Sequence, residues 1–193
     1  IEPHLSVTGG ASAEWIPIKP KTDVAFLFAI IHVLLHEHPR DRLDLPFLKN
    51  VTSSPYLIGP NGYFLRCADT HKPLMIDPRT GQAVPFDTRG IEPALEGAFT
   101  VDGVEIGPDK EVITHRGVEV HPAFEQLVDH VKPYSPEWAS SICDVPAATI
   151  RRVTNEFLDH AHVGETIEID GVTLPFRPVS ISFGKTVNNG WGG

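Results

Sequence analysis

Histidine pairs are the residues whose spacing most directly suggests metal chemistry. His32 and His36 lie four residues apart, and His38 follows them. Histidines at i and i+4 of a helix lie on one face and can share a metal ion. The three residues between the first two are Val-Leu-Leu, so the glutamate of the HExxH motif is absent. Because histidine is favoured at helix carboxyl ends, we interpret this group, and the pair His160 and His162, as helix-end residues and predict no metal site.

A Gly-Lys-Thr sequence at Gly184, Lys185 and Thr186 follows a predicted strand over residues 179–183. A P-loop needs another glycine five residues before the Gly-Lys pair, and that residue is Val179, which argues against a nucleoside-triphosphate P-loop. A glycine-containing turn at the carboxyl end of a strand can still present backbone N–H groups to a phosphate. The sequence leaves two interpretations open, a phosphate-binding turn with Gly184 and Lys185 or an ordinary turn.

Composition and charge exclude several classes of protein. The 193 residues include 16 Lys and Arg against 25 Asp and Glu, a net charge of -9, which argues against a nucleic-acid partner because phosphate neutralisation needs clustered cations. The longest apolar run, Val24–Val33 with Leu34 and Leu35 after it, is shorter than the roughly 20 residues of a bilayer span, so no direct membrane insertion is expected. Cys67 and Cys143 are too few for a disulfide scaffold or a cysteine-rich metal site.

The clearest helix of the sequence begins at Asp23 and runs to about His38. Thr22 suits the N-cap position, and the carboxylate of Asp23 suits the positively polarised first turn. The helix is apolar nearly all round, which predicts burial between two layers. Together with a strand that ends at Phe183, this predicts a three-layer α/β fold in which the helix packs against a mostly parallel sheet.

Residues 56–122 carry the turn signals of an irregular β-rich insertion. Asn61-Gly62, between two short apolar runs, predicts a tight hairpin, and Asp77–Gly81 predicts a second turn. Asp102-Gly103 predicts a third hairpin within residues 99–106. The fold prediction is therefore an α/β domain with β-hairpin insertions.

Residues 123–193 are predicted to be mainly helical. One helix is expected over 123–131, and a second begins after Ser135 as N-cap, with proline at its first position. The spacing of apolar residues predicts an amphipathic helix over 147–161. An Asp-Gly turn then predicts a hairpin over 166–174.

Several segments form an ordered series of motifs. Glu2-Pro3-His4-Leu5-Ser6 and the later EWIPIKPKTD, which ends at Asp23, are similar to a "DPRxS…ADxWxPIRPGTD" pattern. The others are VAFLFAIIHVLLHE, FLKNVTSSPYLI, YSPEWASSICDVPAATIRRVTNEF and GKTVNNGWGG. This series resembles the catalytic subunits of molybdopterin oxidoreductases of the dimethyl-sulfoxide-reductase type. The resemblance covers nearly the whole chain and is less characteristic at about 70–120.

The resemblance implies a fold and a set of cofactors. It implies a Rossmann-like sheet domain, with residues 1–55 as the start of a nucleotide-binding domain, 56–122 as the insertion and 123–193 as the remainder returning towards a neighbouring domain. The family binds molybdenum-bis(molybdopterin guanine dinucleotide). A 4Fe-4S cluster would lie in a part N-terminal to this chain, which we expect to be a segment of a larger protein. The implied partners are the remainder of the same chain and an iron–sulfur electron-transfer subunit.

The resemblance also implies which residues contact the cofactor. Glu2 would accept hydrogen bonds from ribose hydroxyls, and Asp23, with Thr22, would meet the guanine edge. His4 stands where the family commonly has Arg, Lys21 where it has Gly, and Glu2 where it has Asp. The turn residues Gly184 and Lys185 complete the predicted cofactor-binding set. We predict no catalytic residue and no metal ligand in the segment, which should be inactive by itself.

The predicted function is therefore that of a catalytic-subunit segment of a molybdopterin-dependent oxidoreductase. One alternative is a non-catalytic nucleotide-binding or subunit-interaction α/β domain. An NAD-type enzyme is disfavoured because no GxGxxG occurs in the sequence. The sequence does not indicate a substrate or a cellular compartment.

Overall fold

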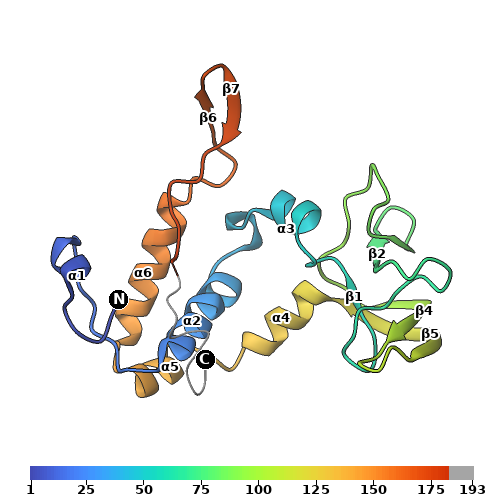
Figure 1. Ribbon diagram of the computed structural model, residues 1–193, viewed down its shortest axis with the longest axis horizontal. Coiled ribbons are helices and arrows are strands. Elements are labelled where there is room, and N and C mark those ends of the chain that lie inside the picture. The colour runs from blue at the N-terminus through green and yellow to red at the C-terminus, as the bar shows by residue number, and fades with distance from the viewer. Residues whose placement is uncertain (183–193) are drawn as a thin grey trace. The chain divides into compact units, whose positions relative to one another are not determined.

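The computed structural model describes residues 1–182, which form two compact units (Figure 1). The first unit combines residues 1–44 with the described residues from 130 onward, and the second is the continuous stretch Leu45–Asp129. The domain boundaries expected from the sequence, at 55 and 122, stay a prediction. The elements of the first unit are α1 (Val7–Ala11), α2 (Asp23–His32), the π-helical η1 (Val33–Glu37), the 3-10 helix η2 (Arg40–Arg42), α5 (Pro136–Cys143), α6 (Ala147–His160), β6 (Thr166–Ile169) and β7 (Val172–Pro175). Those of the second are α3 (Leu45–Val51), β1 (Leu57–Ile58), β2 (Leu74–Asp77), β3 (Gln82–Pro85), β4 (Phe99–Ile106), β5 (Val112–Pro122) and α4 (Ala123–Val131), whose last residues reach the first unit.

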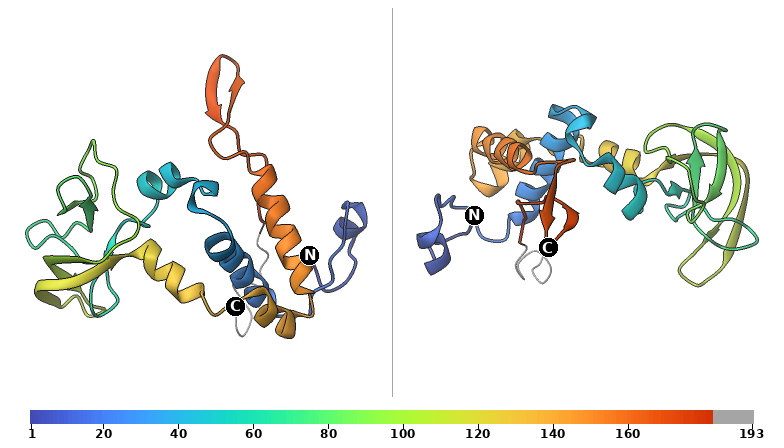
Figure 2. Two further views of the ribbon diagram at one scale, coloured as in Figure 1. Left: turned by 180° about the vertical axis from the view of Figure 1, so that it is seen from behind. Right: turned by 90° about the horizontal axis from the view of Figure 1, so that it is seen from above.

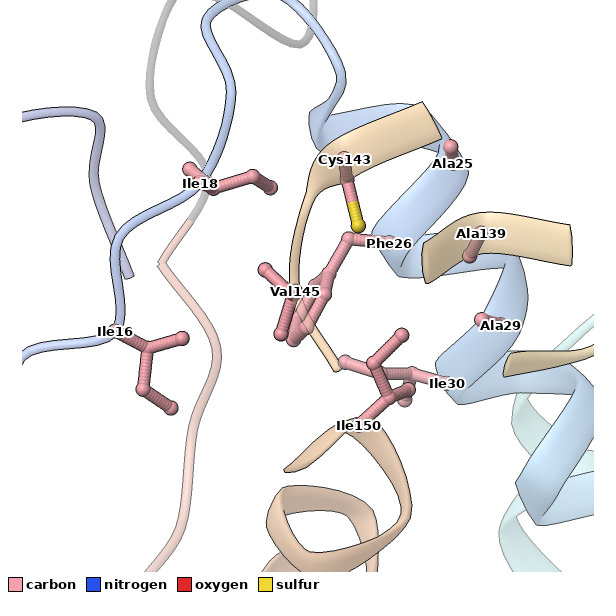
Figure 3. Packing of buried hydrophobic residues seen from close by; sticks show 10 residues of the cluster. All are labelled: Ile16, Ile18, Ala25, Phe26, Ala29, Ile30, Ala139, Cys143, Val145 and Ile150. Atoms are coloured by element: carbon pink, nitrogen blue, oxygen red, sulfur yellow. The ribbon is translucent and has the colours of Figure 1, made fainter. Parts of the chain in front are cut away.

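Helix α2 forms the centre of the first unit. Its buried residues Phe26 and Ile30 pack among Val145 and Ile150, which lead into and lie on α6 (Figure 3). Small residues on α2 and α5, among them the fully buried Ala139, allow the two helices to approach closely. The apolar circumference of α2 is thus covered by other helices and by an extended segment that carries Ile16 and Ile18.

The prediction of a Rossmann-like, mostly parallel sheet is wrong for the described residues. Their three sheets are antiparallel, with strand orders β1-β5-β4, β2-β3 and β6-β7. The fully apolar helix did not require a sheet, because α5 and α6 bury the same surface. Residues 179–182 are not a strand, and Phe183 lies outside the described residues. The one parallel contact in this part of the chain is an isolated bridge between Glu2 and Pro17.

The second unit is built around a long β-ribbon. β4 and β5 pair along their length, β1 adds to the edge of β5, and the β2–β3 hairpin contributes Leu74 and Ile76 to the same core. Leu57 and Leu65 flank the predicted Asn-Gly turn and are both fully buried. The backbone N–H of Gly59 donates to the Tyr63 carbonyl at 2.8 Å, which confirms the turn.

A buried carboxylate holds that turn. Glu105 on β4 is fully buried and accepts hydrogen bonds from the backbone N–H of Tyr63 (3.0 Å) and from the Asn61 backbone (3.2 Å) and side chain (2.9 Å). The Nε2 atom of His115 lies 2.7 Å from Oε2, though not in hydrogen-bonding geometry. A Cβ at Gly59 would lie 2.4 Å from the Glu105 side chain, so only glycine fits there. The turn and the ribbon are therefore locked together by one acidic side chain.

The hairpin predicted at Asp102-Gly103 is wrong. β4 runs continuously from Phe99 to Ile106, and its register with β5 shifts between Val101 and Gly103. The Asp102 carboxylate accepts a hydrogen bond from the backbone N–H of Gly117 at 2.7 Å, and Gly117 has a φ of 56°. The Asp-Gly pair thus marks a β-bulge whose partner lies on the other strand, a pairing that local sequence does not reveal.

The remaining local predictions in the C-terminal part are confirmed. The hydroxyl of Ser135 accepts a hydrogen bond from the Trp138 backbone N–H at 3.3 Å and caps α5. α6 and the β6–β7 hairpin lie where the spacing predicts them. No helix in the described part of the chain is long and apolar enough to cross a membrane.

Arg151 on α6 joins three helical elements of the first unit. Its guanidinium donates to both carboxylate oxygens of Glu37 in η1, with two distances of 2.8 Å, and to Glu137 in α5. These hydrogen bonds to Arg151, with its positive charge, lower the pKa of Glu137 from 4.5 to about 2. A carboxylate with a lowered pKa stabilises the folded state above its unfolded pKa, and that stabilisation is lost as the pH falls towards the folded value.

We expect Glu137→Gln to flatten the pH dependence of stability between pH 4.5 and about 2. In the unmodified protein the thermal midpoint should decline through this interval as Glu137 takes up a proton, and the variant lacks that proton uptake. Thermal unfolding of both proteins across this pH range measures the difference. Identical slopes would contradict the assignment of this titration to Glu137.

Candidate functional site

A cavity of about 490 Å³ lies in the first unit and brings together two of the predicted site residues. Its lining includes the carboxylates of Glu2 and Asp23, which are far apart in the sequence. Phe26 and Ile30 of α2 and Phe157 of α6 supply apolar walls. The cavity is therefore a largely hydrophobic recess with two acidic groups at its lining.

The carboxylate of Glu2 is held by its own loop. Its Oε1 accepts hydrogen bonds from the backbone N–H of Ser6 (2.9 Å) and from the Ser6 hydroxyl (2.8 Å). These hydrogen bonds from Ser6 lower the pKa of Glu2. A Cβ at Gly9 would lie 2.2 Å from the same oxygen, so glycine leaves room for the carboxylate. Glu2 is thus oriented as an ionised hydrogen-bond acceptor.

Backbone contacts place Glu2 against the segment that precedes α2. The Glu2 N–H donates to the Ile16 carbonyl at 3.2 Å, and the indole N–H of Trp15 donates to the Glu2 carbonyl at 3.1 Å. The Glu2–Pro17 bridge lies in the same place. Because Ile16 and Ile18 are anchored in the core, this segment carries Glu2 to the cavity that Asp23 also lines.

Asp23 is the first residue of α2, where the partial positive charge of the helix terminus favours a carboxylate. Within residues 1–182 its carboxylate makes no hydrogen bond or ion pair, so its lone pairs are available to a ligand. The predicted side-chain cap at Thr22 is wrong. The Thr22 hydroxyl donates to the Lys19 carbonyl at 2.6 Å instead of accepting from the helix, although Thr22 occupies the N-cap position.

The other predicted site residues do not line the cavity. Lys21 is exposed and has a φ of 66°, a left-handed conformation that favours glycine, which accounts for the glycine of the family pattern at this position. His4 is exposed in the loop after Glu2. Gly184 and Lys185 lie outside the described residues. The structure therefore brings together Glu2 and Asp23, with Thr22 directly beside them in sequence.

The sequence analysis missed the residues that shape the cavity. Ser6 holds Glu2 and also caps α1, its hydroxyl accepting from the Gly9 N–H at 3.2 Å. A Ser four residues after the acid, at the start of a helix, was the available signal. Phe157 on α6 and the backbone around Ser180 could not be assigned, since their proximity to α2 depends on tertiary packing.

The histidines have structural partners. Nδ1 of His32 lies 3.0 Å from the Val131 carbonyl, and the rings of His32 and His36 are 4.8 Å apart. Nδ1 of His160 lies 2.7 Å from the Glu156 carbonyl. Among the described residues no group of three or more His, Cys, Asp or Glu could hold a metal ion.

The lining chemistry favours one kind of ligand. Carboxylates accept hydrogen bonds from N–H and O–H donors, and apolar or aromatic walls accommodate a flat ring. The lining formed by the described residues contains no Lys or Arg, so it suits the base and sugar of a nucleoside better than its phosphates. The residues present therefore fit the nucleoside end of a dinucleotide.

No family model matches the chain. Among known proteins, it is similar to the large sulfite dehydrogenase component of Allochromatium vinosum, with 32% identity over 170 residues that cover 81% of this chain and 16% of the relative. It is 31% identical to the molybdopterin-containing thiosulfate reductase protein PhsA of Salmonella typhimurium over 123 residues, or 55% of this chain and 16% of that protein. It is 27% identical to the alpha chain of perchlorate reductase from Dechloromonas aromatica over 195 residues, or 81% of this chain and 20% of that protein.

The chain spans 16–20% of the length of these relatives. All three carry the name of a dehydrogenase or reductase, and the matches agree with the ordered motifs that begin at Glu2 and continue through α6. The chain belongs to the molybdopterin oxidoreductase family.

Proposed function

We propose that the chain is a segment of the catalytic subunit of a molybdopterin-dependent oxidoreductase, and that it binds the guanosine end of a pterin guanine dinucleotide. The observation that carries the proposal is the shared cavity of Glu2 and Asp23, because it joins two acceptors with apolar walls in one recess. The relatives support the oxidoreductase family, and one of them is named for its molybdopterin.

Each acidic residue has a distinct part in the proposal. A guanine presents two adjacent N–H donors, from N1 and the N2 amine, and the unpaired carboxylate of Asp23 can accept both. Ribose presents hydroxyl donors, which Glu2 accepts as an ionised carboxylate. Thr22, Lys21 and His4 belong to the same two loops and complete the proposed contact set on this side.

The cofactor in this proposal is molybdenum-bis(molybdopterin guanine dinucleotide), which supplies the redox chemistry when bound. This segment contributes binding and orientation of one nucleotide end. Gly184 and Lys185 remain proposed contacts to its phosphates. The proposal further includes a 4Fe-4S cluster elsewhere in the full-length protein and an iron–sulfur partner subunit, and the segment alone should be inactive.

Asp23→Asn in the full-length enzyme tests the guanine contact. Asparagine keeps the size of the side chain but replaces one acceptor oxygen by an N–H₂ donor, which faces the guanine donors unfavourably. Hydrogen bonds to a charged group contribute about 1.5–3 kcal/mol, so the affinity for the guanine end should fall roughly tenfold to a hundredfold. The measurement is the molybdenum content and the GMP released by acid hydrolysis, per mole of purified enzyme.

Asp41→Asn is the matched control. Asp41 also lies in the first turn of a short helix of the first unit, is exposed, and does not line the cavity. It should leave molybdenum and GMP at the level of the unmodified enzyme. Full occupancy in Asp23→Asn would instead show that Asp23 serves only the start of α2.

A further inference from the structure

The β6–β7 hairpin has one face made entirely of aliphatic side chains. Ile167 pairs directly with Leu174, and Ile169 pairs with Val172, so all four project from the same side of the ribbon. Their exposed fractions are 39%, 41%, 50% and 56%, respectively. Half-exposed aliphatic groups in this number form a continuous apolar patch, which we call the aliphatic face.

The opposite face and the rim are polar. Glu168 and Thr173 pair on the other side, and Asp170 lies in the turn with a φ of 52°. The hairpin and its flanks, residues 164–175, carry three acidic residues and no Lys or Arg. The division between the two faces follows the strand period of two, so the pattern is that of a half-buried sheet.

The hairpin is attached to the first unit at its base alone among the contacts of the described residues. The Phe176 N–H donates to the Glu165 carbonyl at 2.9 Å, and the ring of Phe176 lies 5.1 Å from that of His162. Figures 1 and 2 show the ribbon extending beyond the end of α6. A two-stranded hairpin by itself is marginally stable in water, and this one has its apolar side exposed.

We infer that the aliphatic face docks onto another segment of the same, longer polypeptide, one with an aliphatic centre and Lys or Arg at its rim. Four half-exposed side chains offer on the order of a few hundred Å², whereas a stable interface between separate proteins needs roughly 800 Å² per partner. A segment of the same chain is already tethered, so a small patch suffices. The relatives, of which this chain spans 16–20%, have the additional length for such a segment. The basic rim follows from the acidic charge of the hairpin.

This inference rests on the part of the proposed function that places the chain within a longer catalytic subunit, and it is independent of the nucleotide. Its test uses single cysteines in the full-length enzyme, Ile169→Cys and Leu174→Cys on the aliphatic face, with Glu168→Cys and Thr173→Cys as matched controls. Labelling with N-ethylmaleimide is followed at each site by peptide mass spectrometry and referred to the urea-unfolded enzyme. Molybdenum content, measured in parallel, separates a failure of this inference from a failure of the cofactor proposal.

The aliphatic-face cysteines should be labelled roughly tenfold or more slowly than the controls, since their modification then needs local opening. This difference should be the same at all enzyme concentrations and without partner subunits. Equal rates on both faces would overturn the inference. Protection that appears only with a partner subunit, or only at high enzyme concentration, would overturn it in favour of that subunit or of a second copy. If a variant does not fold, hydroxyl-radical footprinting of Ile167 and Leu174 in the unmodified enzyme gives the same comparison.

Discussion

Replacing Glu105 by alanine should destabilise the second unit by roughly 3–5 kcal/mol, because breaking a buried charged network leaves its partners unsatisfied. The side chain is fully buried and accepts from the Asn61 side chain and from the backbone N–H groups of Asn61 and Tyr63. Alanine would leave these donors without an acceptor and open a cavity beside Gly59. The measurement is native-state hydrogen exchange in the full-length enzyme, read at the amides of β4 and β5.

Glu119→Ala is the matched control for this variant. Glu119 belongs to β5 of the same ribbon, but its side chain is 73% exposed, and its nearest charged contact, to His121, is 3.9 Å. Removal of such a surface carboxylate typically changes stability by less than about 0.5 kcal/mol. If both variants exchange at the same rate, the buried carboxylate does not hold the ribbon to the turn.

Phe26→Ala should destabilise the first unit by roughly 3–5 kcal/mol, the usual range for truncating a buried phenylalanine. Phe26 is 4% exposed and lies at the centre of the cluster formed by α2, α5 and α6 (Figure 3). It also lines the cavity, so the variant should lose bound nucleotide together with stability. Hydrogen exchange of the α6 amides and the GMP content of the purified enzyme measure the two effects.

Phe28→Ala provides the comparison on the same helix. Phe28 is half-buried, stacks on Tyr134 with ring centroids 4.9 Å apart, and does not line the cavity. The loss of such a contact and of its partial burial should cost about 1–2 kcal/mol and leave the GMP content unchanged. An equal loss of stability in the two variants would contradict the central position of Phe26 in the core.

Local signals predicted the elements that depend on neighbouring residues. Ser135 before a proline identified the start of α5, and the alternation around Asp170-Gly171 identified the β6–β7 register. The Asp102-Gly103 turn failed because its conformation is set by Gly117 on another strand. The parallel sheet failed for a similar reason. An apolar circumference shows that α2 is buried, but the sequence does not say whether helices or strands surround it.

The candidate site follows the same division. Glu2 and Asp23 were indicated by family motifs, and the structure adds that both line one cavity. Its walls could not be predicted, since Phe157 reaches the cavity only through the packing of α6 on α2. The cap predicted at Thr22 failed because the Lys19 carbonyl competes for the same hydroxyl.

The discontinuous first unit has a consequence for the order of folding during synthesis. α2 leaves the ribosome before the whole of Leu45–Asp129, whereas α5 and α6, which cover it, follow that stretch. The continuous second unit can fold as soon as it emerges, and its folding shortens the loop that must close to bring α5 and α6 back to α2. Until then the apolar surface around Phe26 and Ile30 stays uncovered within the unit, so the nascent chain should be most prone to chaperone binding while residues 45–129 are being made.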